Sequence, residues 1–184
     1  MKELETRIID IDVEKLRKDL ININSKKVKE ENQINNIYDF PDRRLLANKG
    51  YARIRIVEDL LNNKFISFIT TKKMLSQERF KVMEENESII EDGEMGKKIL
   101  ESLGLELIDS IKKYRESYKY KNTLIEIDIN EKSFCPFPYV EFETSSEEEL
   151  QEILKLLGYK LEDTTSKTIY EILKEKGIDS QKGL

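Results

Sequence analysis

The sequence predicts a mainly β protein of the α+β type, in which antiparallel strands close into a barrel with a charged interior and helices pack outside. Short segments that alternate apolar with charged residues recur along the chain, and such alternation is typical of strands. Charged pairs at every second position appear in several of these segments, with both signs. Stripes with helical spacing are few and short. The prediction therefore places charge inside the barrel and apolar residues outside.

Seven segments show the alternation of strands. Ile125 and Ile127 fall on one face of their segment, whereas Glu126 and Asp128 fall on the other. The segment that begins at Lys64 mixes apolar and polar residues on each face, so the sequence does not indicate which of its faces turns inward. The predicted strands run from Lys2 to Ile9, Tyr51 to Val57, Lys64 to Thr71, Glu78 to Ile90, Ile111 to Lys119, Thr123 to Asn130 and Tyr139 to Thr144.

Four segments have helical periodicity. The clearest one has Ser146 as its N-cap, Glu149 three positions later as a capping box, and Gly158 as its stop. Its apolar face is formed by Leu150, Ile153, Leu154 and Leu157, and the first helix has a stripe of Val13, Leu16 and Leu20. The predicted helices run from Asp12 to Asn22, Glu94 to Leu103, Ser146 to Leu157 and Thr165 to Lys176.

The charged pairs predict a polyionic interior. One such pair is typical of a solvated strand face, but five in separate strands favour convergence on a common ligand. Buried charges are stable only where water, opposite charges or a ligand compensate them. The five sets are Glu3, Glu5 and Arg7; Arg53 and Arg55; Lys113 and Arg115; Glu126 and Asp128; and Glu141 and Glu143.

Length and composition indicate one domain over residues 1–177 and a flexible tail over 178–184. The chain has 184 residues, 38% of them charged, and a net charge of -5, so no overall basic field attracts nucleic acid. Its charged N-terminus offers no signal or membrane segment. We expect a cytoplasmic protein with no nucleic acid or membrane partner.

The residue types restrict the chemistry. Without histidine, the chain cannot use His-based acid-base catalysis or most transition-metal sites. Cys135 is the single cysteine, so there is no internal disulfide. Carboxylates would have to hold any metal, and oxygen ligands select hard cations such as Mg²⁺, Mn²⁺ or Ca²⁺.

Cationic and acidic residues side by side suit a polyphosphate and its metal. Arginine forks and lysine charges bind phosphate oxygens, and carboxylates bind the metal while leaving positions open for phosphate and water. The inward-facing cations are predicted to be Arg7, Arg53, Arg55, Lys72, Lys81, Lys113 and Arg115, and the acids Glu3, Glu5, Glu85, Glu87, Asp128, Glu141 and Glu143.

These motifs resemble the CYTH superfamily, the triphosphate tunnel metalloenzymes, which includes class IV adenylyl cyclases, thiamine triphosphatases and inorganic tripolyphosphatases. Glu3-x-Glu5-x-Arg7 is similar to the family's ExExK signature. Further matches follow in the family's order over nearly the whole chain: Tyr38-Asp39-Phe40-Pro41, Ala52-Arg53-Ile54-Arg55, Ile69-Thr70-Thr71-Lys72, Lys113-Tyr114-Arg115, Ile127-Asp128, Tyr139-Val140-Glu141-Phe142-Glu143 and Lys167-Thr168-Ile169-Tyr170-Glu171-Ile172-Leu173.

The resemblance implies an eight-stranded antiparallel tunnel that binds a triphosphate end-on. It implies Mg²⁺ or Mn²⁺ at carboxylates matching Glu3, Glu5, Asp128, Glu141 and Glu143, to which we add Glu85 and Glu87. Catalytic roles are assigned to Glu3, Glu5 and Lys72. The substrate-binding set is the seven inward cations together with Lys167, which only the resemblance selects.

Three departures from the family pattern stand out. Arg7 replaces the signature lysine, and a guanidinium binds phosphate but is a poor general base. Met83 lies where a polar residue is expected, so a bulge near Arg79 is one alternative. Pro136 and Pro138 replace a glycine before the last strand.

The leading hypothesis is a metal-dependent hydrolase of a small-molecule triphosphate, either tripolyphosphate, thiamine triphosphate or a nucleotide. A class IV adenylyl cyclase, releasing cyclic AMP and pyrophosphate from ATP, is the first alternative. A non-catalytic polyphosphate or nucleotide sensor and a purely structural barrel are the others. The sequence leaves the substrate, the metal, the general base and the oligomeric state open, although a homodimer would be in keeping with the family.

Overall fold

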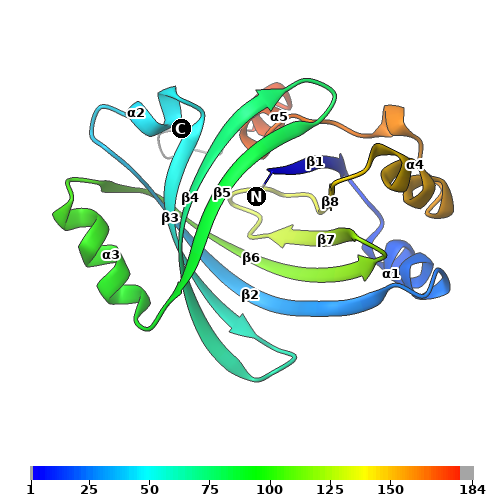
Figure 1. The fold of residues 1–184 in the computed structure, drawn as a ribbon, viewed down its shortest axis with the longest axis horizontal. Helices are drawn as coiled ribbons and strands as arrows, with labels where there is room; N and C mark the ends of the chain where they lie inside the picture. Colours follow the sequence, from blue (N-terminus) through cyan, green and yellow to red (C-terminus); the bar gives the residue numbers. More distant parts are fainter. Residues whose placement is uncertain (1, 179–184) are drawn as a thin grey trace.

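The computed structural model describes residues 2–178, with side chains from residue 4 onward, and its eight described strands form one closed antiparallel barrel (Figure 1). Around the barrel the order is β1-β5-β4-β3-β2-β6-β7-β8. The strands are β1 (Lys2–Ile9), β2 (Lys26–Asp39), β3 (Gly50–Asp59), β4 (Lys64–Gln77), β5 (Lys81–Ile90), β6 (Glu106–Tyr120), β7 (Thr123–Asn130) and β8 (Tyr139–Thr144).

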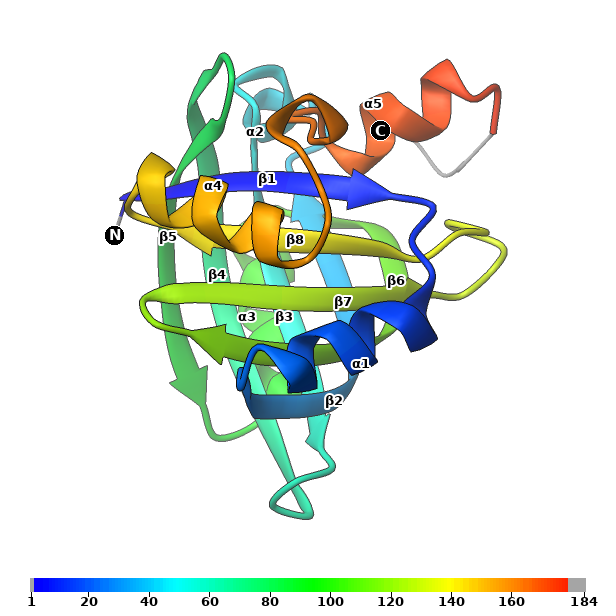
Figure 2. The same cartoon turned by 90° about the vertical axis from the view of Figure 1, so that its right-hand side faces the viewer.

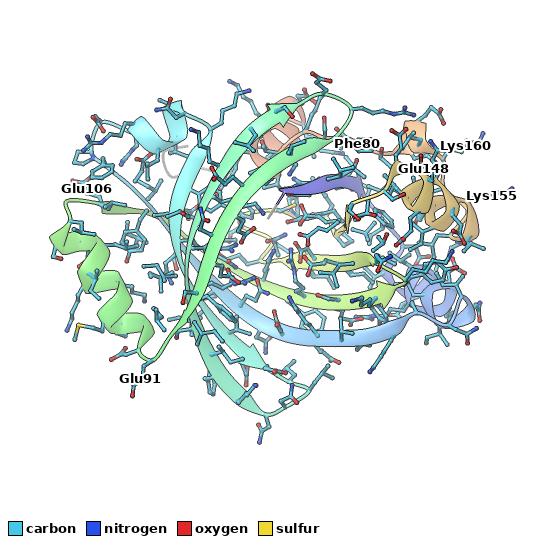
Figure 3. All side chains as sticks on the ribbon, viewed as in Figure 1. Phe80, Glu91, Glu106, Glu148, Lys155 and Lys160 are labelled. Atoms are coloured by element: carbon cyan, nitrogen blue, oxygen red, sulfur yellow. The ribbon has the colours of Figure 1, made fainter. Side chains whose placement is uncertain are left out.

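The helices lie outside the barrel, as the sequence predicts. The labelled side chains of Glu148, Lys155 and Lys160, on α4 and just after it, point away from the barrel (Figure 3). The helices are α1 (Val13–Asn22), α2 (Arg44–Ala47), α3 (Gly93–Ser102), α4 (Glu147–Leu156) and α5 (Ile169–Glu175), with a 3-10 turn at Leu161–Asp163.

All seven predicted strands are present, and β2 is the one that the sequence analysis missed. Polar residues occupy both of its faces. Asn35 lines the lumen and donates to Gln33 on the same face, while Asn32 and Asn36 bond to Glu58 and to the Ile54 carbonyl. No apolar alternation therefore marked this strand. β4 and β6 are also longer than predicted, and each contains a register shift against its neighbour.

The largest core lies on the outer face of the barrel, under α1 and α4. Figure 2 shows these two helices across β6, β7 and β8. Leu16 and Leu20 of α1 and Ile153 of α4 are almost fully buried against Ile127 and Phe142 of the strands. The apolar side chains of the alternating strands thus turn outward and are covered by helices, which confirms the predicted facing.

The N-terminus of α4 differs in one detail from the prediction. Ser146 accepts the predicted bond from the Glu149 amide at 3.2 Å. The Glu149 carboxylate, however, accepts from the Asn122 amide at 2.8 Å and the Thr123 hydroxyl at 2.6 Å. It therefore fastens α4 to the β6–β7 turn and does not complete a capping box.

Two smaller cores lie elsewhere: one covers the outer surface, and the other includes side chains that line the barrel cavity. One packs α3 through Leu100 against Tyr38 and Ile54. The other joins α5, the loop over residues 131–138 and the adjoining ends of β2 and β6, with Ile172 and Leu173 at its centre. Of the predicted tail, Ile178 packs against this second cluster, and the remainder lies outside the described residues. None of the helices within residues 2–178 has the length and apolar character needed to cross a bilayer.

Asp39 is expected to be a strong determinant of stability. Its carboxylate is fully buried and accepts from the amides of Phe40, Leu45 and Leu46 at 2.6–3.0 Å. In Asp39→Asn the amide group would face one of these donors, which costs about 1–3 kcal/mol and lowers the Tm by about 3–10 °C. Thermal unfolding measures the change, and Asp42→Asn, at an exposed position, is the control. An equal, small effect of both substitutions would contradict this role.

Candidate functional site

The barrel encloses a cavity of about 560 Å³ lined by side chains from all eight strands. That size is typical of small-molecule sites. The lining contains eight Lys or Arg side chains and six glutamates, which confirms the charged lumen. In β4 the lumen face is the one that carries Thr70 and Lys72, and the ring of Phe68 on this face lies under Arg55 at 4.8 Å.

One ionic network spans β3, β4 and β5. Arg55 Nη2 donates to both oxygens of Glu87 at 2.7 and 2.9 Å. Arg53 reaches Glu85 at 3.2 Å and Glu87 at 3.3 Å, and Lys72 pairs with Glu85 at 2.9 Å. These side chains project inward at alternate positions, as the period-two spacing predicts.

A second network spans β1, β6, β7 and β8. Arg115 grips Asp128 with two bonds of 2.6 Å, contacts Glu126, and reaches Glu141 at 3.2 Å. Lys113 adds a bond to Asp128 at 2.8 Å. Burial would lower the pKa of Arg115, but Asp128 and Glu126 outweigh it and hold that pKa above its ordinary value. Arg115 therefore stays charged in the interior.

Glu5 joins the two networks. It accepts from Lys81, lies 2.9 Å from Arg7 and 3.7 Å from Lys72. Burial would raise the pKa of Glu5, yet the three cations outweigh burial and keep it well below its ordinary value. For Lys81, burial first and Arg7 second lower the pKa in spite of Glu5. This cluster has more positive charge than Glu5 alone compensates.

Glu143 is the one lumen carboxylate in the described part of the chain that makes no ion pair within salt-bridge distance. It faces Glu5 across β1 and β8. Burial and then Glu126 raise the pKa of Glu143 to about 8, against the charges of Arg115 and Lys72. Its carboxyl group is therefore mostly protonated at neutral pH.

Several arginine N–H groups in the lumen have no partner. Among the described side chains, Arg7 Nε and Nη1, Arg53 Nε and Arg55 Nε are buried without a hydrogen bond. A buried, unsatisfied donor on a charged group is costly. The three arginines that carry these four donors line one cavity, and they indicate a site for an anion with several oxygens.

The structure brings most of the predicted site residues together, and three of them are not among the described residues that line the cavity. The seven predicted cations of the strands line the cavity or contact its acids. Asp128 lies behind the lining, fully buried beneath Arg115 and Lys113. The side chain of Glu3 lies outside the described residues. Lys167 is not brought into the cavity: it is half exposed and pairs with Glu175 at 2.7 Å.

Sequence reasoning omitted several lining residues. Glu126 was visible as a member of a charged pair, but only its neighbour Asp128 entered the predicted site. Asn35 and Lys29 belong to the strand that was missed. Tyr51, Phe134 and Tyr170 come from segments far apart in the sequence, and no local pattern relates them.

The acids have the donor chemistry for a hard divalent cation, although they are engaged elsewhere. Glu5 of β1 faces Glu143 of β8, Glu141 of β8 faces Arg7 of β1, and Glu126 of β7 is opposite Glu141. Within the described residues, no three carboxylate or thiol groups form a ready metal-binding arrangement. Arginines and lysines hold these acids, except Glu143, so metal binding has to exchange these partners.

Comparisons with known proteins agree with this geometry. The sequence model of the CYTH domain family matches residues 1–169. No curated protein matches the chain significantly.

Solved structures share the fold along most of the chain. The PH1012 protein from Pyrococcus horikoshii is 25% identical, with a TM-score of 0.74, over 92% of this chain and 98% of that one. A putative adenylate cyclase from Vibrio parahaemolyticus is 18% identical, with a TM-score of 0.74, over 94% and 97%. HpAC1 from Hippeastrum, a putative adenylyl cyclase described as having dominant triphosphatase activity, is 18% identical, with a TM-score of 0.63, over 96% and 88%.

The raised pKa of Glu143 predicts a stability that falls with pH. The folded state retains the Glu143 proton up to about pH 8, whereas the unfolded chain releases it near its ordinary pKa, so stability is lost as pH rises between these values. The Glu143→Gln substitution removes this pH-dependent loss of stability, because glutamine does not ionise. In metal-free buffer with EDTA, its Tm should equal that of the wild type at pH 5 and exceed it by about 2–8 °C at pH 9, equivalent to about 1–2 kcal/mol. Exposed Glu84→Gln is the control, and a difference independent of pH would refute the assignment.

Proposed function

This chain belongs to the CYTH domain family, and from that premise we propose that it is a divalent-metal-dependent enzyme that hydrolyses a small-molecule triphosphate in its barrel lumen. Water adds to the terminal phosphorus, the phosphoanhydride bond to the bridging oxygen breaks, and phosphate and the shortened product leave with release of a proton. The observation that carries the proposal is the set of arginines with unpartnered N–H groups that line one cavity.

The cations are suited to hold the phosphate chain. Arg53 and Arg55 lie on one wall, and Arg7 and Arg115 on the other. Guanidinium groups bind phosphate oxygens in pairs, and a dry site strengthens each of these bonds. Lys72 and Lys81, next to Glu5, supply point charges between the walls. Together these groups would fix the triphosphate and neutralise the charge that develops on the leaving oxygen.

The metal would be Mg²⁺ or Mn²⁺, held by Glu5, Glu141 and Glu143 with Glu3, Glu126 or Asp128 in support. When bound, it supplies charge neutralisation at the phosphate oxygens and orients the attacking water. Glu85 and Glu87 stay with Arg53 and Arg55 in the structure, which favours a role in orienting these arginines. Burial would lower the pKa of Arg7, but Glu141 and Glu5 outweigh it and raise that pKa above its ordinary value. Arg7 is therefore assigned to phosphate binding and not to proton transfer.

Adenylyl cyclase activity is the alternative that the same lumen supports. It requires a nucleoside whose 3'-hydroxyl attacks the α-phosphorus and expels pyrophosphate. The CYTH fold accommodates both reactions, since one similar structure bears the description of a putative cyclase and another that of a putative cyclase with dominant triphosphatase activity. A cytoplasmic location and a homodimer remain predictions from the sequence.

Product analysis distinguishes these activities. The purified chain is incubated with tripolyphosphate, thiamine triphosphate or ATP, each with Mg²⁺ or Mn²⁺, and phosphate, pyrophosphate and cyclic AMP are resolved. We expect phosphate release that depends on the metal and is abolished in the Glu141→Ala/Glu143→Ala double variant. Cyclic AMP with pyrophosphate would establish the cyclase instead. Triphosphate binding without metal and without turnover would support the sensor hypothesis.

Two adjacent lysines test the assignment of the lumen. Lys72 faces the cavity, whereas Lys73 is exposed on the outer face of the same strand. Lys72→Met should lower kcat/KM for tripolyphosphate by about 10²-fold, the effect of removing one preorganised charged donor. Lys73→Met should leave it within about twofold, because an outward side chain contacts no substrate. Steady-state kinetics with a Tm for each variant checks this, and equal losses would place the site elsewhere.

A further inference from the structure

We infer that the substrate carries a heteroaromatic ring on its triphosphate, and that this ring binds at one end of the lumen between Tyr51, Phe134, Tyr170 and Asn130. This inference rests on the proposed function and deepens it, because it names the substrate class. We call this region the aromatic end; besides the four residues named, it comprises Ile37, Leu46, Ile111 and Ile169.

The aromatic end is formed by segments that meet only in the folded barrel. Tyr51 opens β3 just after α2, Phe134 lies in the loop that follows β7, and Tyr170 lies in the first turn of α5. Figures 1 and 2 both place α2 and α5 on the same side of the barrel. Phe134 and Tyr170 meet edge to face with ring centroids 5.6 Å apart. Tyr51 and Tyr170 stay partly exposed to the cavity.

These rings differ from the other aromatic side chains of the lumen. Arg7 covers Tyr139 at 5.5 Å, and Arg55 covers Phe68 at 4.8 Å, so protein cations already occupy one face of these two rings. Among the described residues, no Lys or Arg lies over Tyr51, Phe134 or Tyr170. The three rings pack in one apolar cluster, and the partly exposed Tyr51 and Tyr170 are the ones that can stack on a flat ligand. Such stacking tolerates any base.

Asn130 supplies a directional group on the cavity wall, next to the loop that carries Phe134. It lines the cavity and is 8% exposed, yet its Nδ2 has no hydrogen-bond partner. Asn130 is the last residue of β7, faces Lys113 of β6, and leads into the loop that carries Phe134. A buried amide donor without a partner is unfavourable. A ring nitrogen or carbonyl oxygen would satisfy it, whereas inorganic tripolyphosphate has no group that extends beyond the phosphates.

The aromatic end continues directly from the charged band. Tyr51 pairs across the strands with Lys72 and is followed at alternate positions by Arg53 and Arg55. A triphosphate on these cations would thus have its ester-linked phosphate next to Tyr51 and its terminal phosphate toward Arg55 and Glu87. The ring then reaches the aromatic end, and the terminal phosphate lies among the charged side chains of the lumen.

Substrate ratios test the inference. We measure kcat/KM for ATP and thiamine triphosphate relative to tripolyphosphate with Mg²⁺, for the wild type, Tyr51→Leu, Tyr51→Phe and Asn130→Ala. The wild type should prefer a ring-bearing substrate. Tyr51→Leu should lower this ratio about 5- to 150-fold, the effect of losing one stacked ring, and Asn130→Ala about 2- to 12-fold, the effect of one hydrogen bond. Tyr51→Phe should retain the ratio. Phe65→Leu, on the outer face at 76% exposure, controls for loss of an aromatic side chain.

The outcomes separate this inference from the proposed function. Preference for tripolyphosphate, with ratios that the substitutions do not move, overturns the aromatic end while leaving the hydrolase in place. If no substrate is turned over, the affinities for a non-hydrolysable imido analogue of ATP and for tripolyphosphate are compared by equilibrium dialysis. Tighter binding of the analogue that Tyr51→Leu weakens supports the aromatic end although the hydrolase fails, and equal binding of both ligands overturns it.

Discussion

Compensation of charge inside a closed barrel is the constraint on which the rest of this structure depends. Arg115 is fastened to Asp128, Glu126 and Glu141, and Glu5 is shared among Arg7, Lys72 and Lys81. Removing one member of such a set would leave another ion buried and alone, which is costly. The charged residues at alternate strand positions therefore depend on one another, and not only on a ligand.

The placement of charge inside dictates the placement of apolar residues outside. A strand that turns Glu126 and Asp128 inward must turn Ile125 and Ile127 outward, and this outer face needs cover. Leu16 and Leu20 of α1 and the apolar face of α4 supply it. The partly buried ion pair of Glu116 with Arg17 also ties α1 to β6 at 2.6 Å. The helices thus complete a core that an ordinary barrel would have built in its interior.

The sequence predicted the strands whose apolar and charged residues alternate, and it missed the groups of residues that come together only when the barrel closes. Strands such as β7 and β8 were found at their true bounds because their apolar and charged faces alternate without interruption. β2 was missed because polar partners satisfy both of its faces. Most lumen cations followed from the same alternation, but Glu126 was passed over for its neighbour. Tyr51, Phe134 and Tyr170 share no spacing that could have linked them, since their proximity depends on the order of strands around the barrel and on α5 closing over one end.

The ionic networks also set the charge balance that a triphosphate and a metal would meet on binding. The lining has eight cations and six glutamates, Asp128 adds an acid behind them, and Glu143 holds its proton, so the empty lumen is only slightly positive. A triphosphate brings several negative charges, more than this excess compensates, and it competes with carboxylates for the same arginines. On the proposed function, a divalent cation at Glu5, Glu141 and Glu143 would resolve both difficulties, because it would add positive charge and release Arg7, Lys72 and Lys81 toward phosphate. The acids thus hold the cations in place in this structure and, on the proposed function, would become metal ligands when the substrate binds. The ion pairs that stabilise the barrel would then be the ones that ligand binding exchanges.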